Sequence, residues 1–162
     1  MINFKDAFLK GASKFEDKDE LEINYKFGNP ASEEDLEELE KHLKTEIPEI
    51  LFKLFSEFNG IEVTQEYWSA GQLYLSTTFI INKIPKYFQE SGNYVPPKEQ
   101  LASVIFFAQQ NGLAALFALC VKPFDNFNTG EVLVLESDTG EFEREIGSLE
   151  EFIQSSAYCH LG

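Results

Sequence analysis

The chain has 162 residues, enough to bury one hydrophobic core without disulfides or metal and too few to suggest several domains. Its 13 basic and 28 acidic residues give a net charge of −15 at pH 7, and a field of this sign repels the phosphate backbone of nucleic acids. No apolar run approaches the ~20 residues that cross a bilayer, and no basic segment precedes an apolar one at the start. We therefore expect a soluble, cytoplasmic protein that binds neither nucleic acid nor membrane.

The acidic excess is concentrated in two segments. Residues 31–51 contain eight acids and two bases, and residues 131–151 contain eight acids and one base. Their net charges of −6 and −7 leave only −2 for the rest of the chain. Either these segments merely keep the protein soluble, or they attract a basic protein partner.

The first 28 residues are expected to form an N-terminal helical extension. Residues 3–15 place four apolar side chains near one face of an amphipathic helix, namely Phe4, Phe8, Leu9 and Phe15. A solvated link at 16–20 precedes residues 21–27, in which apolar and polar residues alternate as they do in a strand. The run Gly28-Asn29-Pro30 ends that pattern.

Two helices with clear boundaries follow. Ser32 is the expected N-cap of the first helix, because its hydroxyl can accept from the free amide of Asp35. Apolar residues at spacings of three and four then predict a buried stripe. Pro48 opens the second helix, where its fixed φ and missing N–H are tolerated. Asn59 and Gly60 are expected to end it, since both accept the left-handed conformation of a helix C-terminus.

The middle of the chain is expected to consist of short strands and loops. Residues 61–63 and 73–75 are typical of brief strands, with a polar, aromatic-containing loop at 65–71 between them. Residues 78–82 are compatible with an extended run or a single turn. Residues 83–100 contain three prolines and a Gly-Asn pair, which together predict a long surface loop.

The C-terminal half predicts two hairpins and a closing helix. Residues 101–122 contain two apolar runs on either side of Asn111-Gly112, a dipeptide that favours a tight hairpin turn. Neither run alternates, so both strands are expected to be central and covered on both faces. Residues 131–137 and 141–146 predict a second, acidic hairpin, and Ser148 is the expected N-cap of the last helix.

The order of features in residues 29–60 carries a family resemblance. A Ser-capped acidic helix is followed by Ile-Pro-Glu, a helix rich in Leu and Phe, and then Phe-Asn-Gly. This order resembles the N-terminal signature of the SUKH superfamily, which joins fungal cell-wall-synthesis regulators to bacterial toxin-immunity proteins. The matching residues are Glu40, Pro48, Leu54, Asn59 and Gly60. The run Ser148-Leu149-Glu150-Glu151-Phe152 is similar to the closing helix of the same superfamily.

The resemblance implies a fold and a set of domain boundaries. We expect a single α+β domain, in which a mixed, mainly antiparallel sheet packs against the helices. The SUKH-like domain is expected to cover residues 29–156, after the extension at 1–28 and before a tail at 157–162.

The sequence shows no visible catalytic apparatus. The two histidines are His42, on the solvent side of an acidic helix, and His160, in the tail. Cys120 lies within an apolar run, and Cys159 is adjacent to His160. This arrangement does not predict a nucleophile, a base and an oxyanion hole that meet. We therefore expect reduced thiols, no cofactor and no enzymatic activity.

Clustered acids are the remaining candidates for a chemical site. A helical face shared by Glu33, Glu37 and Glu40, or a strand face shared by Glu141, Glu143 and Glu145, could bind a cation. Exposed acids are more often only solvated, and no EF-hand spacing is present, so no metal site is predicted. Glu40 is expected to accept hydrogen bonds from backbone amides near the helix junction or Asn59-Gly60, which is a structural role.

Aromatic residues in or beside loops form the predicted contact surface, because such side chains bury a large area at an interface for little loss of entropy. They are Tyr67, Trp68, Tyr74, Tyr87, Phe124 and Phe127, to which we add Glu141 and Glu143 of the acidic hairpin. The alternative for each aromatic residue is that it covers the edge of the core.

Function is implied by the resemblance rather than by the residues themselves. It implies an immunity-type protein that binds and neutralises a cognate bacterial toxin by occlusion, and the charge indicates that the toxin is basic. We expect a monomer or a weak homodimer. One alternative is a scaffold or regulatory protein of cell-wall synthesis or signalling, and a weaker one is an enzyme that depends on a metal or small molecule.

Overall fold

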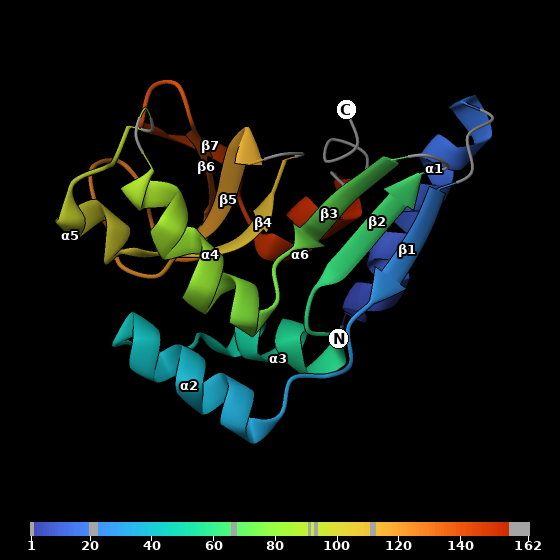
Figure 1. Cartoon of the computed structure of the whole chain (residues 1–162), viewed down its shortest axis with the longest axis horizontal. Coiled ribbons are helices and arrows are strands. Elements are labelled where there is room, and N and C mark those ends of the chain that lie inside the picture. Colours follow the sequence, from blue (N-terminus) through green and yellow to red (C-terminus); the bar gives the residue numbers. More distant parts are fainter. Residues whose placement is uncertain are drawn as a thin grey trace.

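The computed structural model describes residues 2–19, 23–65, 68–90, 92, 94–110 and 113–155. Over these residues the chain forms a seven-stranded sheet in the order β1-β2-β3-β4-β5-β6-β7, flanked by helices, in a single α+β domain (Figure 1). Each of the six strand pairings is antiparallel, so the expected mixed sheet is in fact antiparallel throughout. The elements are α1 Phe4–Asp19, β1 Ile23–Phe27, α2 Glu33–Leu43, α3 Glu49–Glu57, β2 Ile61–Gln65, β3 Trp68–Tyr74, α4 Thr77–Gln89, α5 Lys98–Leu101, β4 Val104–Gln109, β5 Ala115–Cys120, β6 Val132–Glu136, β7 Phe142–Ile146 and α6 Leu149–Ser155.

Helices α2 and α3 form where the sequence predicts them. The Ser32 hydroxyl accepts from the amide of Asp35 at 3.1 Å, and the Asp35 carboxylate accepts from the amide of Ser32 at 2.9 Å, which completes a capping box. Pro48 is the N-cap of α3. The Glu40 carboxylate accepts from the amide of Ile47 at 3.1 Å, so Glu40 has the predicted structural role at the helix junction.

The end of α3 differs from the prediction at Asn59. The helix ends at Glu57, the next residue is extended, and only Gly60 has a positive φ, of 92°. Instead of adopting a left-handed conformation, Asn59 accepts from the amide of Thr77 at 2.8 Å and donates to its hydroxyl at 3.1 Å. Asn59 therefore joins the end of α3 to the start of α4. A Cβ on Gly60 would lie 3.0 Å from the carbonyl oxygen of Tyr74, so both its φ and its surroundings favour glycine.

The predicted loop at 83–100 is wrong at both ends, and the extended run or single turn at 78–82 is wrong as well; only the described residues between Gln89 and Lys98 are irregular. Residues 77–89 form α4, with Pro85 inside it, and α5 follows at 98–101. Proline inside a helix removes a hydrogen bond and crowds the preceding turn. The helix nevertheless forms because the buried side chains Thr77, Ile80, Ile84 and Tyr87 recur at helical spacing.

The strands confirm most of the predicted extended runs. Residues 61–63 lie in β2 and residues 73–74 in β3. Of the expected loop at 65–71, residues 65 and 68–71 belong to strands, and 66–67 lie outside the described residues. Both predicted hairpins are present, as β4–β5 and β6–β7. Each residue of β4 and β5 is buried, which confirms that these strands are central. The turn dipeptide at 111–112 lies outside the described residues.

Helices cover both faces of the sheet. On one face, the ring of Tyr74 on β3 lies among those of Phe8 from α1, at 5.6 Å, and Phe152 from α6, at 6.2 Å. On the other face, α4 contributes Phe88, whose ring lies 5.7 Å from that of Phe106 on β4. Figure 1 shows α4 in front of β4 and β5, with α1 and α6 behind the sheet.

The N-terminal segment packs on the same core. Phe4 and Phe8 of α1 are fully buried, and β1 pairs with β2 at one edge of the sheet. The amide of Phe4 donates to both carboxylate oxygens of Glu57, at 2.8 and 3.1 Å, which caps α1 from α3. Helix α1 extends to Asp19, so most of the link predicted at 16–20 is helical.

Candidate protein-binding face

Two of the aromatic residues predicted to contact a partner are in the core. Tyr74 is 1% exposed and lies among rings from both terminal helices. Tyr87 is 6% exposed and its hydroxyl is hydrogen-bonded to Ser137; burial raises the pKa of the tyrosine and this bond lowers it less. Neither side chain can bind a partner from this position, so the alternative considered for each, a place in the core, is correct. Trp68 begins β3, and Tyr67 lies outside the described residues.

The other four predicted contact residues lie at one end of the molecule. Phe127, Glu141 and Glu143 line one cleft of ≈ 520 Å³, and the ring of Phe124 packs 5.1 Å from that of Phe127. The complete lining is Gln100, Asp125, Asn126, Phe127, Glu141, Phe142, Glu143 and Arg144. The cleft is thus formed by the loop after β5, the edge strand β7 and the short helix α5.

The loop after β5 contains a tight turn at residues 124–127. The amide of Phe127 donates to the carbonyl of Phe124 at 2.8 Å, and the reciprocal bond measures 3.3 Å. Asp125, at the first central position of the turn, has a φ of 48° and accepts from the side-chain amide of Gln100 at 3.2 Å. The ring of Phe124 also lies 5.7 Å from that of Phe142, so the turn is packed against β7.

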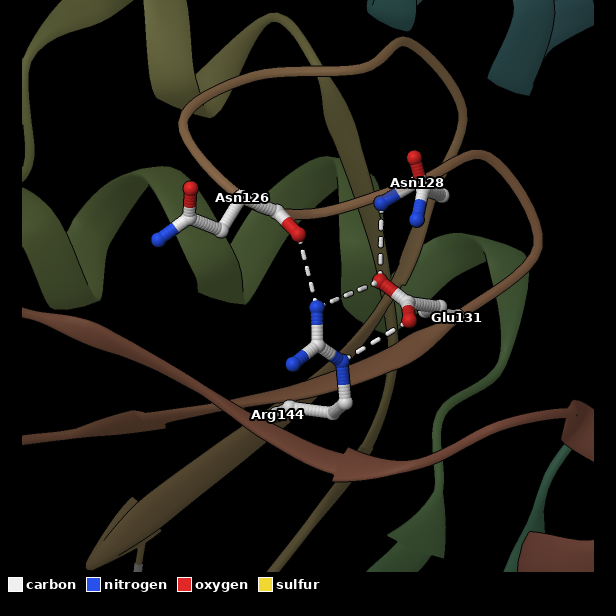
Figure 2. Close-up of polar contacts among 4 residues, drawn as sticks. All are labelled: Asn126, Asn128, Glu131 and Arg144. Carbon is white, nitrogen blue, oxygen red and sulfur yellow. Dashed lines mark hydrogen bonds and ion pairs between the residues drawn. The ribbon is translucent and has the colours of Figure 1, made fainter.

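Arg144 connects this turn to the sheet, and it is the only arginine in the sequence. Figure 2 shows its guanidinium between Glu131 and Asn126. The Nε donates to Glu131 Oε1 at 2.8 Å, while Nη2 donates to the carbonyl of Asn126 at 2.7 Å and to Glu131 Oε2 at 3.3 Å. Glu131 Oε2 also accepts from the amide of Asn128 at 2.7 Å. The guanidinium carbon lies 5.5 Å from the ring centre of Phe127, within range of a cation–π interaction.

One carboxylate near the cleft is paired with a cation, and the others are not. Arg144 and its hydrogen bonds hold the pKa of Glu131 below its usual value, and the Asn128 amide adds to this effect. This is the one ion pair among the residues that the structure describes. Within the same part of the chain, Asp125, Glu141 and Glu143 therefore have no cationic partner, and the cleft has an excess of negative charge.

Comparison with known families assigns the chain. The model of the SMI1 / KNR4 family (SUKH-1) matches residues 30–155, which is most of the chain. The protein belongs to the SUKH-1 family. A search of curated proteins finds no match. Membership is consistent with both the immunity and the cell-wall-regulator functions known for the superfamily, which is generally non-catalytic.

This SUKH-1 protein also has exposed apolar side chains near the cleft. Tyr94 is 61% exposed and Val95 is 52% exposed. A Cβ on Gly140, in the turn between β6 and β7, would lie 2.6 Å from the Cβ of Tyr94, so the two backbones are in close contact. Sequence reasoning missed this pair, because residues 90–97 carry no signal that links them to a turn some 45 residues later.

Two of the four groups considered for catalysis lie in the described part of the chain, and they occupy different environments. Cys120 is buried and donates to the carbonyl of Lys122 at 3.1 Å, and burial raises the pKa of its thiol. His42 is exposed on α2, whereas Cys159 and His160 lie outside the described residues. In the described part of the SUKH-1 chain, no three His, Cys, Asp or Glu residues are arranged to hold a metal. No helix there is both long and apolar enough to cross a membrane.

Proposed function

We propose that this SUKH-1 protein is an immunity-type protein, which binds a cognate bacterial toxin in the cytoplasm and neutralises it by occlusion. The observation that supports this best is the cleft between the loop after β5 and strand β7, where carboxylates without cationic partners lie beside aromatic side chains. Interfaces of this composition bind basic protein surfaces, since the charges attract the partner and the rings are desolvated on contact.

The proposed contacts fall into two groups. Glu141, Glu143 and Asp125 attract the toxin and set its orientation, because like-charged or misaligned surfaces are repelled. Phe127 and Tyr94 supply apolar area, one half-buried beside the cleft and the other exposed near it. We keep Phe124, Trp68 and Tyr67 as proposed contacts.

The proposal includes no chemical step by the protein itself. Inhibition by occlusion requires only that the complex covers the active site or the substrate surface of the toxin. We propose a monomer or weak homodimer as the active form, with a SUKH-like domain at 29–156, an extension at 1–28 and a tail at 157–162. No cofactor or metal takes part.

The test uses the reading frame adjacent to the gene. If it encodes a toxin domain, the toxin should arrest growth when expressed alone and should not do so when co-expressed with this protein. The purified pair should form a 1:1 complex, measured by size-exclusion chromatography with light scattering. Failure of both rescue and complex formation would refute the immunity function.

Matched variants then locate the binding face. Tyr94→Ala and Glu141→Gln should each weaken the complex, because one loses apolar contact area and the other loses a charge at the cleft. Glu37→Gln, on the exposed face of α2, removes the same charge elsewhere and should leave the affinity nearly unchanged. If Glu37→Gln weakens the complex and Glu141→Gln does not, the toxin binds the α2 surface instead.

The same purification separates the alternative functions. A regulator of cell-wall synthesis or signalling would co-purify with several weak partners rather than with one stoichiometric toxin. An enzyme would bind a small molecule or metal ion in the cleft, which calorimetric titration would detect in the absence of any protein partner.

A further inference from the structure

We infer that Arg144 is a positioning residue, which holds residues 124–128 in a single preformed shape as one wall of the cleft. The inference depends on the proposed function at one point, which is that this cleft is the toxin-binding site. The shape of the loop itself can be measured in the free protein, so the two claims fail separately.

The contacts of Arg144 are distributed along the loop. One guanidinium bonds the carbonyl of Asn126 and the carboxylate of Glu131, at 2.7 and 2.8 Å. The same carboxylate fixes the amide of Asn128 at 2.7 Å, and the guanidinium lies over the ring of Phe127. Arg144 therefore acts, directly or through Glu131, on three consecutive residues of the loop (Figure 2).

The loop needs such support because its own conformation is unfavourable. Asp125 has a φ of 48°, a left-handed conformation that costs free energy for a residue with a side chain. Asp125 and Asn126, the two central residues of the turn, are exposed, so few packing contacts restrain them. Other restraints include the two backbone bonds between Phe124 and Phe127, the bond from Gln100 to Asp125, and the packing of the Phe124 ring on Phe142. None of these contacts the side chain or carbonyl of Asn126.

Arginine is suited to this position in a way that lysine is not. Its planar guanidinium donates in several fixed directions, and here one group reaches a carboxylate through two nitrogens and a carbonyl through one of them. A lysine ammonium at the end of a flexible chain would keep the charge without fixing the three acceptors in one plane. Arg144→Lys should therefore loosen the loop although the net charge is unchanged.

Positioning and simple electrostatics predict different outcomes for a pair of variants, because they agree on Glu131→Gln and disagree on Arg144→Met. Arg144→Met makes the face more negative, so electrostatics alone predicts tighter binding of a basic toxin, whereas Glu131→Gln makes it less negative and predicts weaker binding. If Arg144 positions the loop, both variants break the same network and both weaken the complex. A preformed surface binds more tightly because less conformational entropy is lost on association.

The first experiment measures amide hydrogen exchange by NMR in the free, full-length protein. In Arg144→Met, Arg144→Lys and Glu131→Gln, the amides of Phe127 and Asn128 should exchange faster by about tenfold, with little change in β5. Lys122→Met is the matched control, because it removes one exposed positive charge from the same neighbourhood without touching the network. Its exchange rates at these two amides should equal those of the wild type.

The second experiment measures binding of the toxin to the same variants by surface plasmon resonance. Arg144→Met and Glu131→Gln should each raise Kd about five- to tenfold, whereas Lys122→Met should not raise it. Unchanged exchange at Phe127 and Asn128 in the Arg144 variants would overturn the inference, and so would tighter binding by Arg144→Met. If the wild type binds no toxin, the proposed function fails, and the exchange result still decides whether Arg144 holds the loop.

Discussion

The two acidic segments, 31–51 and 131–151, have nearly the same charge but differ in what their carboxylates contact. In the first segment, Asp35 caps the start of α2 and Glu40 fixes the amide of Ile47. In the second, Glu131 pairs with Arg144, while Glu141 and Glu143 lie at a cleft without a cationic partner in the described structure. Both segments thus use some carboxylates for local structure, but only in the second do acids without an ion-pair partner line a cleft beside aromatic rings.

This difference teaches that net charge alone does not locate a binding face. The acids of α2 are interspersed with Lys41 and Lys44, which border the same shallow depression as Glu37 and Glu40. In the β6–β7 hairpin, the single cationic side chain, Arg144, is already paired with Glu131. The long-range field attracts a basic partner to either surface, but only the hairpin combines uncompensated acids with a cleft and aromatic rings.

The largest expected effect is on stability and distinguishes the segments directly. The double substitution Ser32→Ala and Asp35→Ala removes the capping box of α2 and should lower the free energy of unfolding by about 2 kcal/mol. The matched pair Glu141→Gln and Glu143→Gln should change it by less than about 0.5 kcal/mol, because exposed side chains without partners contribute little. Urea denaturation measures both. Equal losses of unfolding free energy in the two double variants would show that the two segments do not differ in this way.

The next effect concerns association with the proposed toxin. Because exposed carboxylates steer a basic partner, the association rate of the wild type should fall steeply as salt rises, and Glu141→Gln with Glu143→Gln should reduce it several-fold at low salt. Glu33→Gln with Glu37→Gln should have a smaller effect. Stopped-flow measurements at two or more salt concentrations would test this. An association rate indifferent to salt would remove both acidic surfaces from the mechanism.

A third prediction sharpens the role of Glu40. Glu40→Ala should destabilise the fold by about 1 kcal/mol, because the amide of the buried residue Ile47 loses its acceptor just before α3. Glu40→Gln keeps an acceptor oxygen and should cost less, although it removes the same charge. Equal losses in Glu40→Gln and Glu40→Ala, measured by thermal or urea unfolding, would show that the charge matters more than the hydrogen bond.

The smallest effect is a pH dependence at the hairpin. The pKa of Glu131 is lowered in the folded state by Arg144 and the Asn128 amide, so its contribution to stability is present above its unfolded-state pKa. This contribution should be lost as the pH falls through the lowered, folded-state pKa. In Glu131→Gln the free energy of unfolding should therefore decrease less steeply with falling pH than it does in the wild type. Identical slopes in urea titrations at several pH values would contradict the assignment.

Local patterns predicted the parts of the fold that local interactions decide. The capping box at Ser32, the helix start at Pro48 and the two hairpins depend on neighbours in sequence, and all are present. Helix α4 was missed because Pro85 disfavours a helix locally, whereas burial of its stripe against the rest of the molecule favours one. That burial depends on packing with distant residues, which spacing alone does not show.

The candidate site was predictable only in part, for the same reason. Glu141, Glu143 and Phe127 were selected as exposed acids or loop aromatics, and they do line one cleft. Arg144 was not selected, because its importance comes from reaching Glu131 and Asn126, which lie 13 and 18 positions away. Tyr74 was misjudged because an aromatic residue near a predicted loop looks the same whether it faces solvent or a helix from the far end of the chain.

The junction between β3 and β4 has a consequence for how the molecule opens. These strands share one aligned residue pair, Tyr74 with Ala108, whereas β2–β3 and β4–β5 are paired along their length. The two halves of the sheet, β1–β3 and β4–β7, are joined by few backbone hydrogen bonds, among them the one from the amide of Leu75 to the carbonyl of Phe107 at 2.8 Å. The rings of Tyr74, Phe107 and Phe152 pack across the same junction. Truncating Tyr74 should let the two halves unfold as separate cooperative units, so that a single melting transition becomes two.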